Sequence, residues 1–556
     1  MTAYPSLKRW LAAGLTLVVI GAALFFISRN GPDANPLEPN ARAAQDGKQD
    51  WTMYGGTPSR NMVNLAVKGM PVKWADKVAD ENQKPILIAK NILWTADLGS
   101  KAYGGPIVAG GKVFIGTNNM NPRDKKWIEK EGPKKGRPID LGVLMCFDES
   151  SGKFNWQAVH EKLPIGRVQD WPEEGICSTP FVEGDKFYYV SNRCELIRAD
   201  VKTGKADWTL DMIKELGVFP HNIADCSPLI VGDHIWLVTS NGVDGGHINV
   251  PAPKAPSFIK VEKTKGKVVW QDNSPTKQLL VAPKALLAQD NFMKTLINRG
   301  ELIQHGQWSN PAYGMVNGEA QVIFPGGDGW IYSFDLDGKF LWKFDCNPKD
   351  AFYVLGAKGT RNDFIATPVI YKNRVYIGTG QDPEHLAGVG HLWCIDMTKR
   401  GDVSSELAVD NKVFPPPTKP NPNSAMVWHY GGPTNAADKA RLKRPYYFGR
   451  TMSSCAIHED ILYVADLNGR LSCMDADTGK VHWEVDTGAE IWSSPYYVDG
   501  KVYLGNDDGE VHVFAHGKEM KKLAVNAMGS PVRATPVAAN GVLYVMNANT
   551  LYAIKQ

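Results

Sequence analysis

The sequence predicts an all-β protein, an eight-bladed β-propeller of four-stranded blades, and three observations lead to this prediction. The pentapeptide Gly-Lys-x-x-Trp occurs five times, at 152–156, 204–208, 266–270, 338–342 and 479–483. Runs of β-branched and aromatic residues precede each copy, which indicates a repeated unit of short strands. The two ends of the chain hold complementary parts of one such unit. A period of roughly forty residues is typical of propeller blades.

One copy of the repeat, Asp475 to Trp483, shows why the unit folds as a hairpin. Asp475 ends a strand, and its carboxylate can accept hydrogen bonds from the turn that follows. Thr478 and Gly479 supply the polar residue and the positive φ that a tight turn requires. We therefore expect Trp483 to lie on the next strand, where its ring can pack against a neighbouring unit.

The remaining strands follow by register. First strands start at prolines in seven units, with Cys455 in the matching place of another: Pro106, Pro180, Pro228, Pro311, Pro368, Pro495 and Pro536. An apolar residue of the second strand follows seven residues later: Val113, Phe187, Ile235, Val375, Leu462, Val502 and Leu543. In the unit at Pro311 an insertion displaces this strand to 321–324. A third strand and the Trp strand complete each unit. The insertion 399–450 is expected to wrap the outside of a blade, with Trp428 as its anchor.

The chain ends predict how the ring closes. The last unit, 534–554, has three strands and lacks a Trp strand, whereas Ile92–Leu98 resembles a Trp strand with nothing before it. Pairing of these two segments would leave no exposed sheet edge and would staple the ring shut. The alternative is an open β-solenoid, which would need a cap at each end.

The N-terminus predicts a membrane anchor. Lys8 and Arg9 precede eighteen uncharged, mostly apolar residues, Trp10–Ile27. As a helix these residues span about 27 Å, enough to cross a hydrocarbon core. A cleaved signal peptide is the alternative, although the residues after Ile27 make a poor cleavage site. We expect 1–28 to be a cytoplasmic stub and anchor, 29–50 a flexible tether, and 51–556 a propeller on the extracytoplasmic, periplasmic side.

The net charge and the cysteine content limit the possible functions further. The net charge of +3 gives no argument for a nucleic-acid partner. Eight cysteines in an exported chain suggest disulfides, but Cys146, Cys394 and Cys473 share one register position where a small apolar residue is expected. Cys177, Cys194 and Cys226 should lie at one end of the ring. Whether two of them form a bridge is left open.

The repeat Asp-x-x-Thr-Gly-Lys-x-x-Trp, preceded by Thr/Ser-Pro-Val and Val-Tyr-Val-Gly, resembles the PQQ-like repeat of quinoprotein dehydrogenases and of barrel-assembly propeller lipoproteins. The segment Asp50–Arg60 resembles the lead-in of exported bacterial proteins with this repeat. The resemblance covers about residues 50 to 556 and implies the propeller fold. It implies little about activity, because functional sites vary on a shared fold.

The chain departs from the marks of the best-defined branches of that superfamily. It has no adjacent cysteine pair, which methanol-type and ethanol-type quinoproteins place beside the cofactor. It has no Cys-x-x-Cys-His for haem and no cysteine before residue 146 to carry a lipid. Membrane glucose-type quinoproteins also lack the cysteine pair, so the resemblance still allows a dehydrogenase.

If the propeller has a site, it is expected at the end of the channel where first strands begin. The strand entries there offer these aromatic, charged and amide residues: Tyr103, Asp170, Trp171, Glu173, Glu174, His221, Asp225, His305, Gln307, Trp308, Arg361, Asn362, Asp363, Arg450, Trp492 and Arg533. Loops between second and third strands add Asp328, Gln381, Asp382, Glu384, His385 and Asn468. A tricarboxylated quinone with Ca²⁺ would need aromatic faces, arginines and oxygen ligands of this kind. Polar loops without a ligand would have much the same composition.

Two classes of function therefore compete. The first is a binding or scaffolding propeller of the cell envelope, whose mouth takes an envelope protein or a small-molecule ligand. The second is an oxidoreductase that uses PQQ and calcium to oxidise an alcohol or a sugar, with Asp225 or Asp363 as base. The sequence favours the first class, because the dehydrogenase marks that can be checked are missing. A metal pair between His385 and His391 is also conceivable, but a glycine-rich hairpin explains that segment as well.

Overall fold

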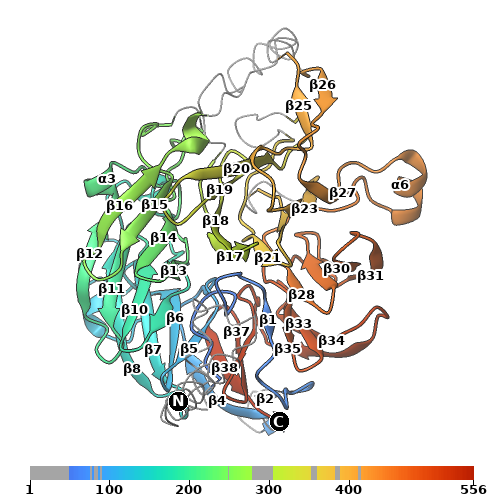
Figure 1. Ribbon diagram of the computed structural model, residues 1–556. Coiled ribbons are helices and arrows are strands. Elements are labelled where there is room, and N and C mark those ends of the chain that lie inside the picture. The colour runs from blue at the N-terminus through green and yellow to red at the C-terminus, as the bar shows by residue number, and fades with distance from the viewer. Residues whose placement is uncertain are drawn as a thin grey trace, which may run out of the picture.

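Eight antiparallel blades are arranged in a ring in the computed structural model of the chain (Figure 1). The model describes residues 49–75, 78–79, 85–87, 90–247, 250–277, 305–351, 360–381, 388–410 and 415–556. First strands of neighbouring blades contact one another, which places them around the centre of the ring. The eight-bladed, mostly-β fold predicted from the repeat is confirmed.

Blades 1 to 4 follow the chain in order. Their strands are β5 (Ile107–Ala109), β6 (Lys112–Asn118), β7 (Leu141–Asp148) and β8 (Phe154–Glu161) in blade 1; β9 (Phe181–Glu183), β10 (Lys186–Val190), β11 (Glu195–Asp200) and β12 (Ala206–Asp211) in blade 2; β13 (Leu229–Val231), β14 (His234–Val238), β15 (Phe258–Glu262) and β16 (Lys267–Asp272) in blade 3; and β17 (Ala312–Val316), β18 (Glu319–Pro325), β19 (Trp330–Phe334) and β20 (Phe340–Asp345) in blade 4.

Blades 5 to 8 complete the ring. Their strands are β21 (Val369–Tyr371), β22 (Arg374–Gly378), β23 (His391–Asp396) and β27 (Met426–Gly431) in blade 5; β28 (Ala456–His458), β29 (Ile461–Ala465), β30 (Arg470–Asp475) and β31 (Val481–Asp486) in blade 6; β32 (Tyr496–Val498), β33 (Lys501–Gly505), β34 (Glu510–Ala515) and β35 (Lys522–Ala527) in blade 7; and β36 (Val537–Ala539), β37 (Val542–Met546), β38 (Thr550–Ile554) and β4 (Ile92–Asp97) in blade 8.

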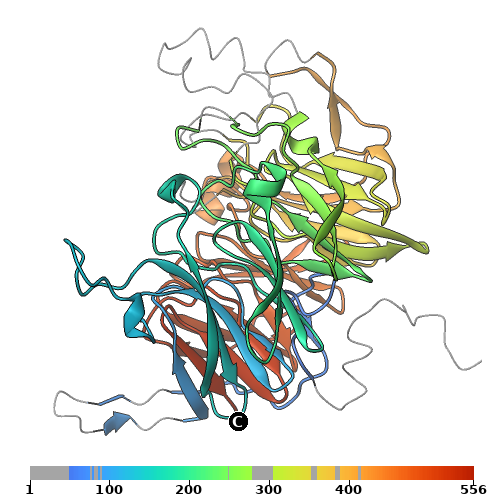
Figure 2. The ribbon, with the colours of Figure 1, turned by 90° about the vertical axis from the view of Figure 1, so that its left-hand side faces the viewer.

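Short elements decorate this ring. Strands β1 (Val63–Asn64) and β24 (Gly401–Asp402) extend blades 7 and 4, and both pair in parallel. The hairpin of β2 (Val78–Ala79) and β3 (Pro85–Leu87) and that of β25 (Glu406–Ala408) and β26 (Thr418–Pro420) lie at opposite ends of the molecule (Figure 2). The helices among the described residues are α3 (Met212–Leu216), α6 (Ala436–Leu442) and the 3-10 turns η2 (Lys125–Trp127), η3 (Gly166–Val168) and η4 (Ser274–Lys277).

Blade 8 is built from both ends of the chain. Strand β4 pairs antiparallel with β38, and Trp94 lies opposite Ala553. This is the pairing that the register of 92–98 predicted. Backbone hydrogen bonds between the two chain ends therefore close the ring, so the open-solenoid alternative is wrong.

At five blade junctions a tryptophan of one blade packs on the hairpin glycine of the next. A Cβ atom on Gly204, the hairpin glycine of blade 2, would lie only 2.5 Å from the ring of Trp156 in blade 1. The Trp156 Nε1–H also donates to the carbonyl of Val201 at 3.2 Å. The pairs Trp94–Gly152, Trp208–Gly266, Trp270–Gly338 and Trp428–Gly479 repeat the close approach of the ring to the glycine. Glycine is required at these turns both for its positive φ and for the flat ring above it.

The repeat tryptophans Trp156 and Trp208 are half-buried. The expectation for Trp428 needs correction. Trp428 does not anchor an external wrap. It lies on β27, the fourth strand of blade 5, and docks on Gly479 like the other repeat tryptophans. The β25–β26 hairpin before β27 and helix α6 after it lie outside the four-stranded blade.

The lead-in residues 49–64 bond to all eight blades. Trp51 pairs with Val108 of blade 1, and Thr52, Pro58 and Ser59 accept backbone hydrogen bonds from blades 2, 4 and 5. Met62 and Asn64 reach blades 6, 7 and 8. Blade 3 is reached by the side chain of Arg60, which is fully buried and donates to carbonyl oxygens of Ser227 and Pro228 at 3.1 Å. The lead-in is thus a plug across the ring, at the inner faces of the first strands.

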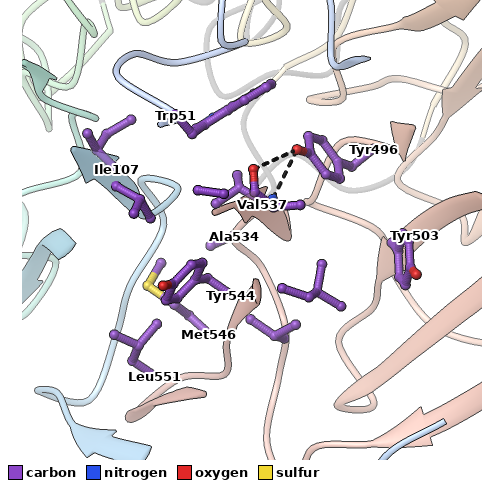
Figure 3. Packing of buried hydrophobic residues seen from close by; sticks show 14 of the residues in the cluster. Trp51, Ile107, Tyr496, Tyr503, Ala534, Val537, Tyr544, Met546 and Leu551 are labelled. Atoms are coloured by element: carbon purple, nitrogen blue, oxygen red, sulfur yellow. Dashed lines mark hydrogen bonds between the residues drawn. The ribbon is translucent and has the colours of Figure 1, made fainter. Parts of the chain in front are cut away.

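The largest apolar core lies where this plug meets blades 7, 8 and 1. The Trp51 ring packs edge-on against Tyr496, with centroids 5.3 Å apart, and Ile107, Val537 and Tyr544 surround the contact (Figure 3). The Tyr496 hydroxyl accepts a hydrogen bond from the backbone N–H of Ala538 at 3.0 Å. The core therefore fixes the plug and the closing blade together.

The predicted anchor Trp10–Ile27 and residues 29–48 of the predicted tether 29–50 lie outside the described residues, whereas Gln49 and Asp50 bond to blades 8 and 1. Among the residues that the structure describes, no helix is long and apolar enough to cross a bilayer. The membrane anchor stays a prediction.

Candidate functional site

A cavity of about 280 Å³ lies at the channel mouth, and all eight blades contribute to its wall. Its lining residues come from the segments that enter the first strands: Lys101, Tyr103, Trp171, Glu174, Cys177, Asn222, Ile223, Asp225, Trp308, Ile365, Met452, Trp492 and Arg533. A second cavity of about 110 Å³ shares most of this wall and reaches Tyr54. Tyr54 belongs to the lead-in plug, so the plug forms the floor of the channel.

One side of the wall is an arginine stacked on aromatic rings. The Arg533 guanidinium lies 4.1 Å from the centroid of the Trp492 ring and makes a bidentate ion pair with Asp507, at 2.9 and 2.7 Å. It also donates to the Tyr103 hydroxyl at 3.2 Å. The Tyr103 and Trp492 rings stack with centroids 5.7 Å apart. The positive charge of this side is therefore already matched by a carboxylate.

A second ion pair lies next to Tyr103, and the entry to blade 3 adds a buried acid. Lys101 Nζ lies 2.6 Å from Glu174 Oε1. Asp225 has a buried Oδ1 atom with no hydrogen-bond partner among the described residues. Burial raises the pKa of the Asp225 carboxyl well above its usual range, so its protonated form is favoured. A protonated carboxyl can donate a hydrogen bond but cannot act as a general base.

Cys177 also lines the cavity and is unbridged. Burial raises the pKa of its thiol well above the usual value, and the nearby Glu174 carboxylate raises it further. Cys194 and Cys226 are buried free thiols, and none of the eight cysteines forms a disulfide in the described structure. The thiol at the mouth is therefore a neutral, unreactive lining group at physiological pH.

Most of the candidates predicted from the sequence fall into three groups. Seven line the cavity: Tyr103, Trp171, Glu174, Asp225, Trp308, Trp492 and Arg533. Four belong to a buried network between blades 4, 5 and 6: Arg361, Asn362, Asp363 and Arg450. His221 and His305 meet in a histidine cluster behind Trp308. Asp382, Glu384 and His385 lie outside the described residues.

The buried network holds the wall of the ring and does not line the cavity. Arg361 donates to the Asp345 carboxylate at 3.0 Å and to the carbonyl of Asp328. Arg450 Nε donates to the amide oxygen of Asn362 at 3.1 Å. Asp363, proposed as a base, is fully buried, and its backbone pairs with that of Gly380. These four residues are not among the residues that line the 280 Å³ cavity, because entry segments also pack between blades and sequence alone does not give their direction.

The metal pair considered between His385 and His391 includes a residue outside the described part of the chain, and His391 itself lies beside another histidine. His391 Nδ1 lies 2.9 Å from Nε2 of His429, on the neighbouring strand β27. Burial lowers the pKa of His391 to about 3 and that of His429 to about 4, so both imidazoles are neutral. The pair is a buried hydrogen bond inside blade 5.

Sequence reasoning missed several lining residues. Asn222 and Ile223 lie in the same entry segment as Asp225, and Ile365 and Met452 are apolar residues in other entries. The search for aromatic, charged and amide residues passed over the three apolar residues by design and overlooked Asn222. His247 was also missed, although it lies in a loop between second and third strands, the class of loop that supplied other candidates.

Comparison with known proteins places the fold in a family. A family model described as outer membrane protein assembly factor BamB matches residues 41–243, 142–406 and 421–519. The chain belongs to this family of PQQ-like β-propellers. The quinohemoprotein alcohol dehydrogenase ADH-IIG of Pseudomonas putida is 41% identical over 64 residues, which cover 10% of this propeller and 9% of the dehydrogenase.

Solved structures share the fold at low identity. The structure of quinohemoprotein alcohol dehydrogenase ADHIIG from Pseudomonas putida HK5 matches with a TM-score of 0.55 and 14% identity, over 93% of this propeller and 81% of that chain. A europium-containing methanol dehydrogenase matches with a TM-score of 0.51 and 14% identity, over 89% of each chain. BamB from Moraxella catarrhalis gives a TM-score of 0.47 and 14% identity, over 84% of this chain and 99% of its own.

The mouth of this PQQ-like propeller does not fit a tricarboxylated quinone. Such a ligand needs cations free to meet three carboxylates and aromatic faces spaced to hold a planar ring. The two cations at the cavity, Lys101 and Arg533, are already paired with Glu174 and Asp507. The Tyr103 and Trp492 rings stack on each other. Arg361 and Arg450 lie away from the cavity.

Proposed function

We propose that this propeller is a binding or scaffolding module of the cell envelope and that its channel mouth receives a compact, mainly apolar or aromatic group. The observation that carries the proposal is the cavity to which all eight blades contribute. Three tryptophans, two aliphatic side chains and a methionine dominate its wall. Cavities of this composition hold apolar groups and orient them with a few polar contacts.

Asp225 supplies the polar contact in this proposal. Its carboxyl is buried and favours the protonated form, so it can donate a hydrogen bond to an acceptor on the ligand. The ion pairs Lys101–Glu174 and Arg533–Asp507 leave little net charge at the wall. An amide or carbonyl group next to an aromatic or aliphatic body matches these features. A side chain of an envelope protein or a small molecule would both present such chemistry.

The cellular setting is proposed from the sequence. The apolar segment Trp10–Ile27 would hold the protein in the cytoplasmic membrane, and residues 29–48 would tether the propeller on the extracytoplasmic side. The mouth would then face partners in the envelope. Fractionation of the native protein together with determination of its mature N-terminus tests this setting.

Binding at the mouth can be tested with N-acetyl-phenylalaninamide as the probe. We expect ligand-observed NMR of the full-length protein in detergent to show saturable binding. Trp308→Ala should weaken binding at least tenfold, because it removes a large contact face from the wall. Asp225→Asn should retain binding, since an amide keeps a neutral donor, whereas Asp225→Leu should weaken it. Trp270→Phe is the matched control, because Trp270 does not line the cavity. Binding that is unchanged in Trp308→Ala would contradict the proposal.

The competing function is a quinoprotein oxidoreductase, and it has its own test. PQQ with Ca²⁺ is added to the purified protein, and quinone absorbance and dye reduction are followed with alcohols and sugars. We expect no stoichiometric quinone binding, because the cations at the mouth are already paired. Tight quinone binding with turnover would replace the binding-module proposal with an enzyme.

A further inference from the structure

Three histidines converge beside the channel mouth. The Nε2 atom of His221 lies 3.1 Å from Nε2 of His305 and 3.2 Å from Nε2 of His247, and the third separation, between His247 and His305, is 2.9 Å. The three nitrogens thus form a nearly equilateral triangle. Zn–N bonds of about 2.0–2.1 Å with angles between 90° and 110° place nitrogens roughly 2.9–3.4 Å apart. The observed triangle fits that spacing.

A hydrogen bond from Nδ1 of His221 fixes the tautomer and the orientation of its ring, as metal binding requires. Its Nδ1 lies 2.8 Å from the carbonyl oxygen of Val243, an acceptor, so Nδ1 carries the proton. The Nε2 atom then holds a lone pair directed at the other two rings. Metal-binding histidines commonly donate their second ring nitrogen to a carbonyl or carboxylate in this way, which sets the tautomer and the ring orientation.

The fold brings these rings together from three separate segments. His221 lies in the entry to blade 3, His247 in the loop between β14 and β15, and His305 in the entry to blade 4. Gly242 permits the approach, because a Cβ atom there would lie 2.4 Å from Cβ of His221 and 2.9 Å from the carbonyl oxygen of His305. His247 adopts a left-handed backbone with φ of 53°. The convergence is built by long-range packing and does not arise from a local turn.

The chemistry of the triangle favours a cation over hydrogen bonds alone. Because His221 keeps its proton on Nδ1, its Nε2 can only accept. Three nitrogens at mutual distances near 3 Å cannot all share protons with linear geometry, and protonation of two rings would place like charges in contact in a buried site. His221 and His305 are 1% and 5% exposed, whereas His247 is half-buried and gives access from solvent. A single metal ion would take one lone pair from each ring.

We propose that His221, His247 and His305 bind a divalent transition-metal ion of the zinc class. Three neutral imidazole ligands select borderline ions such as Zn²⁺ over Ca²⁺ or Mg²⁺, which prefer oxygen. Three protein ligands leave a fourth position for water or an exogenous group. The site touches the mouth, because the Trp308 indole donates to the carbonyl of His221 at 3.1 Å and the next residue, Asn222, lines the cavity. Bound metal would therefore stiffen that wall whatever ligand the mouth receives.

The test is metal binding by the full-length protein after treatment with EDTA and dialysis against Zn²⁺. We expect one equivalent of zinc per chain by elemental analysis, and with Co²⁺ a visible d–d spectrum of a four-coordinate nitrogen site. His247→Ala should reduce zinc affinity at least tenfold in competition with a chromophoric chelator. Because His247 lies in a loop, we expect this variant to stay folded, and thermal melting checks that it does.

A matched control separates this site from other histidines. His429→Gln removes a histidine from the buried pair in blade 5, where only two rings meet, and should leave zinc binding unchanged. Less than a tenth of an equivalent of zinc in the wild type would overturn the proposal. So would full binding in the double variant His247→Ala, His305→Ala.

Discussion

Arg60 shows at the residue scale how a single side chain fixes a plug inside a ring. Its guanidinium is fully buried and donates to four carbonyl oxygens, those of Tyr54, Pro311, Ser227 and Pro228. Burial lowers its pKa to about 10, and no carboxylate pairs with it in the described structure. The charge is tolerated because every arm of the planar group meets an acceptor, a geometry that lysine cannot reproduce.

We expect Arg60→Met to lower the free energy of unfolding by about 3–5 kcal/mol, because it leaves buried carbonyl oxygens of two blades and the plug without a donor. Arg60→Lys should fall between this variant and the wild type, since an ammonium group reaches fewer of the four oxygens. Denaturant unfolding measures both. Arg137→Met, on an exposed insertion, is the control and should stay within about 0.5 kcal/mol of the wild type. An Arg60→Met protein as stable as that control would show that the plug does not depend on this residue.

At the scale of the element, the hairpin glycine and the tryptophan of the preceding blade form one joint. Gly204 has φ of +70° and faces the Trp156 ring, whereas Gly184 has φ of +61° with nothing within 4 Å of an added Cβ. Gly184→Ala should cost about 1 kcal/mol from backbone strain alone. Gly204→Ala should cost that amount plus about 1–3 kcal/mol for displacing the indole. Equal losses in thermal or chemical unfolding would show that the joint carries no packing energy.

The same joint explains how much of the molecule was predictable. The Asp475–Trp483 repeat encodes a turn and a docking ring locally, so blade number and closure could be read from one sequence. The mouth could be predicted only in part, because the direction of an entry segment depends on its neighbours. Trp308 and Asp225 face the channel, while Arg361 in an equivalent entry turns toward Asp345. The plug under the cavity and the approach of His247 to His221 are long-range contacts without a local signal.

At the scale of the whole molecule, stability depends on closure of the propeller ring. Blade 8 is shared between the two ends of the chain, and β4 supplies both its outer strand and Trp94, which docks on Gly152 of blade 1. The Trp94 Nε1–H also donates to the carbonyl of Glu149 at 3.0 Å. Loss of β4 would expose an edge of β38 and undock blade 8 from blade 1, so that each blade in turn could separate from its neighbour.

We therefore expect deletion of residues 91–98 to lower the free energy of unfolding by about 5 kcal/mol or more, given about 1 kcal/mol for each of several lost backbone hydrogen bonds in addition to the lost tryptophan contact. Calorimetry should show a lower melting temperature and a broader transition, because an opened ring unfolds blade by blade. Deletion of 30–45, in the tether, is the control and should leave the melting temperature unchanged. Trp94→Ala separates the two contributions, since it keeps the strand pairing and removes only the docking ring. Equal melting temperatures for the two deletions would mean that the ring is stable without its closing strand. The contacts of the plug with all eight blades would then be what keeps the ring closed.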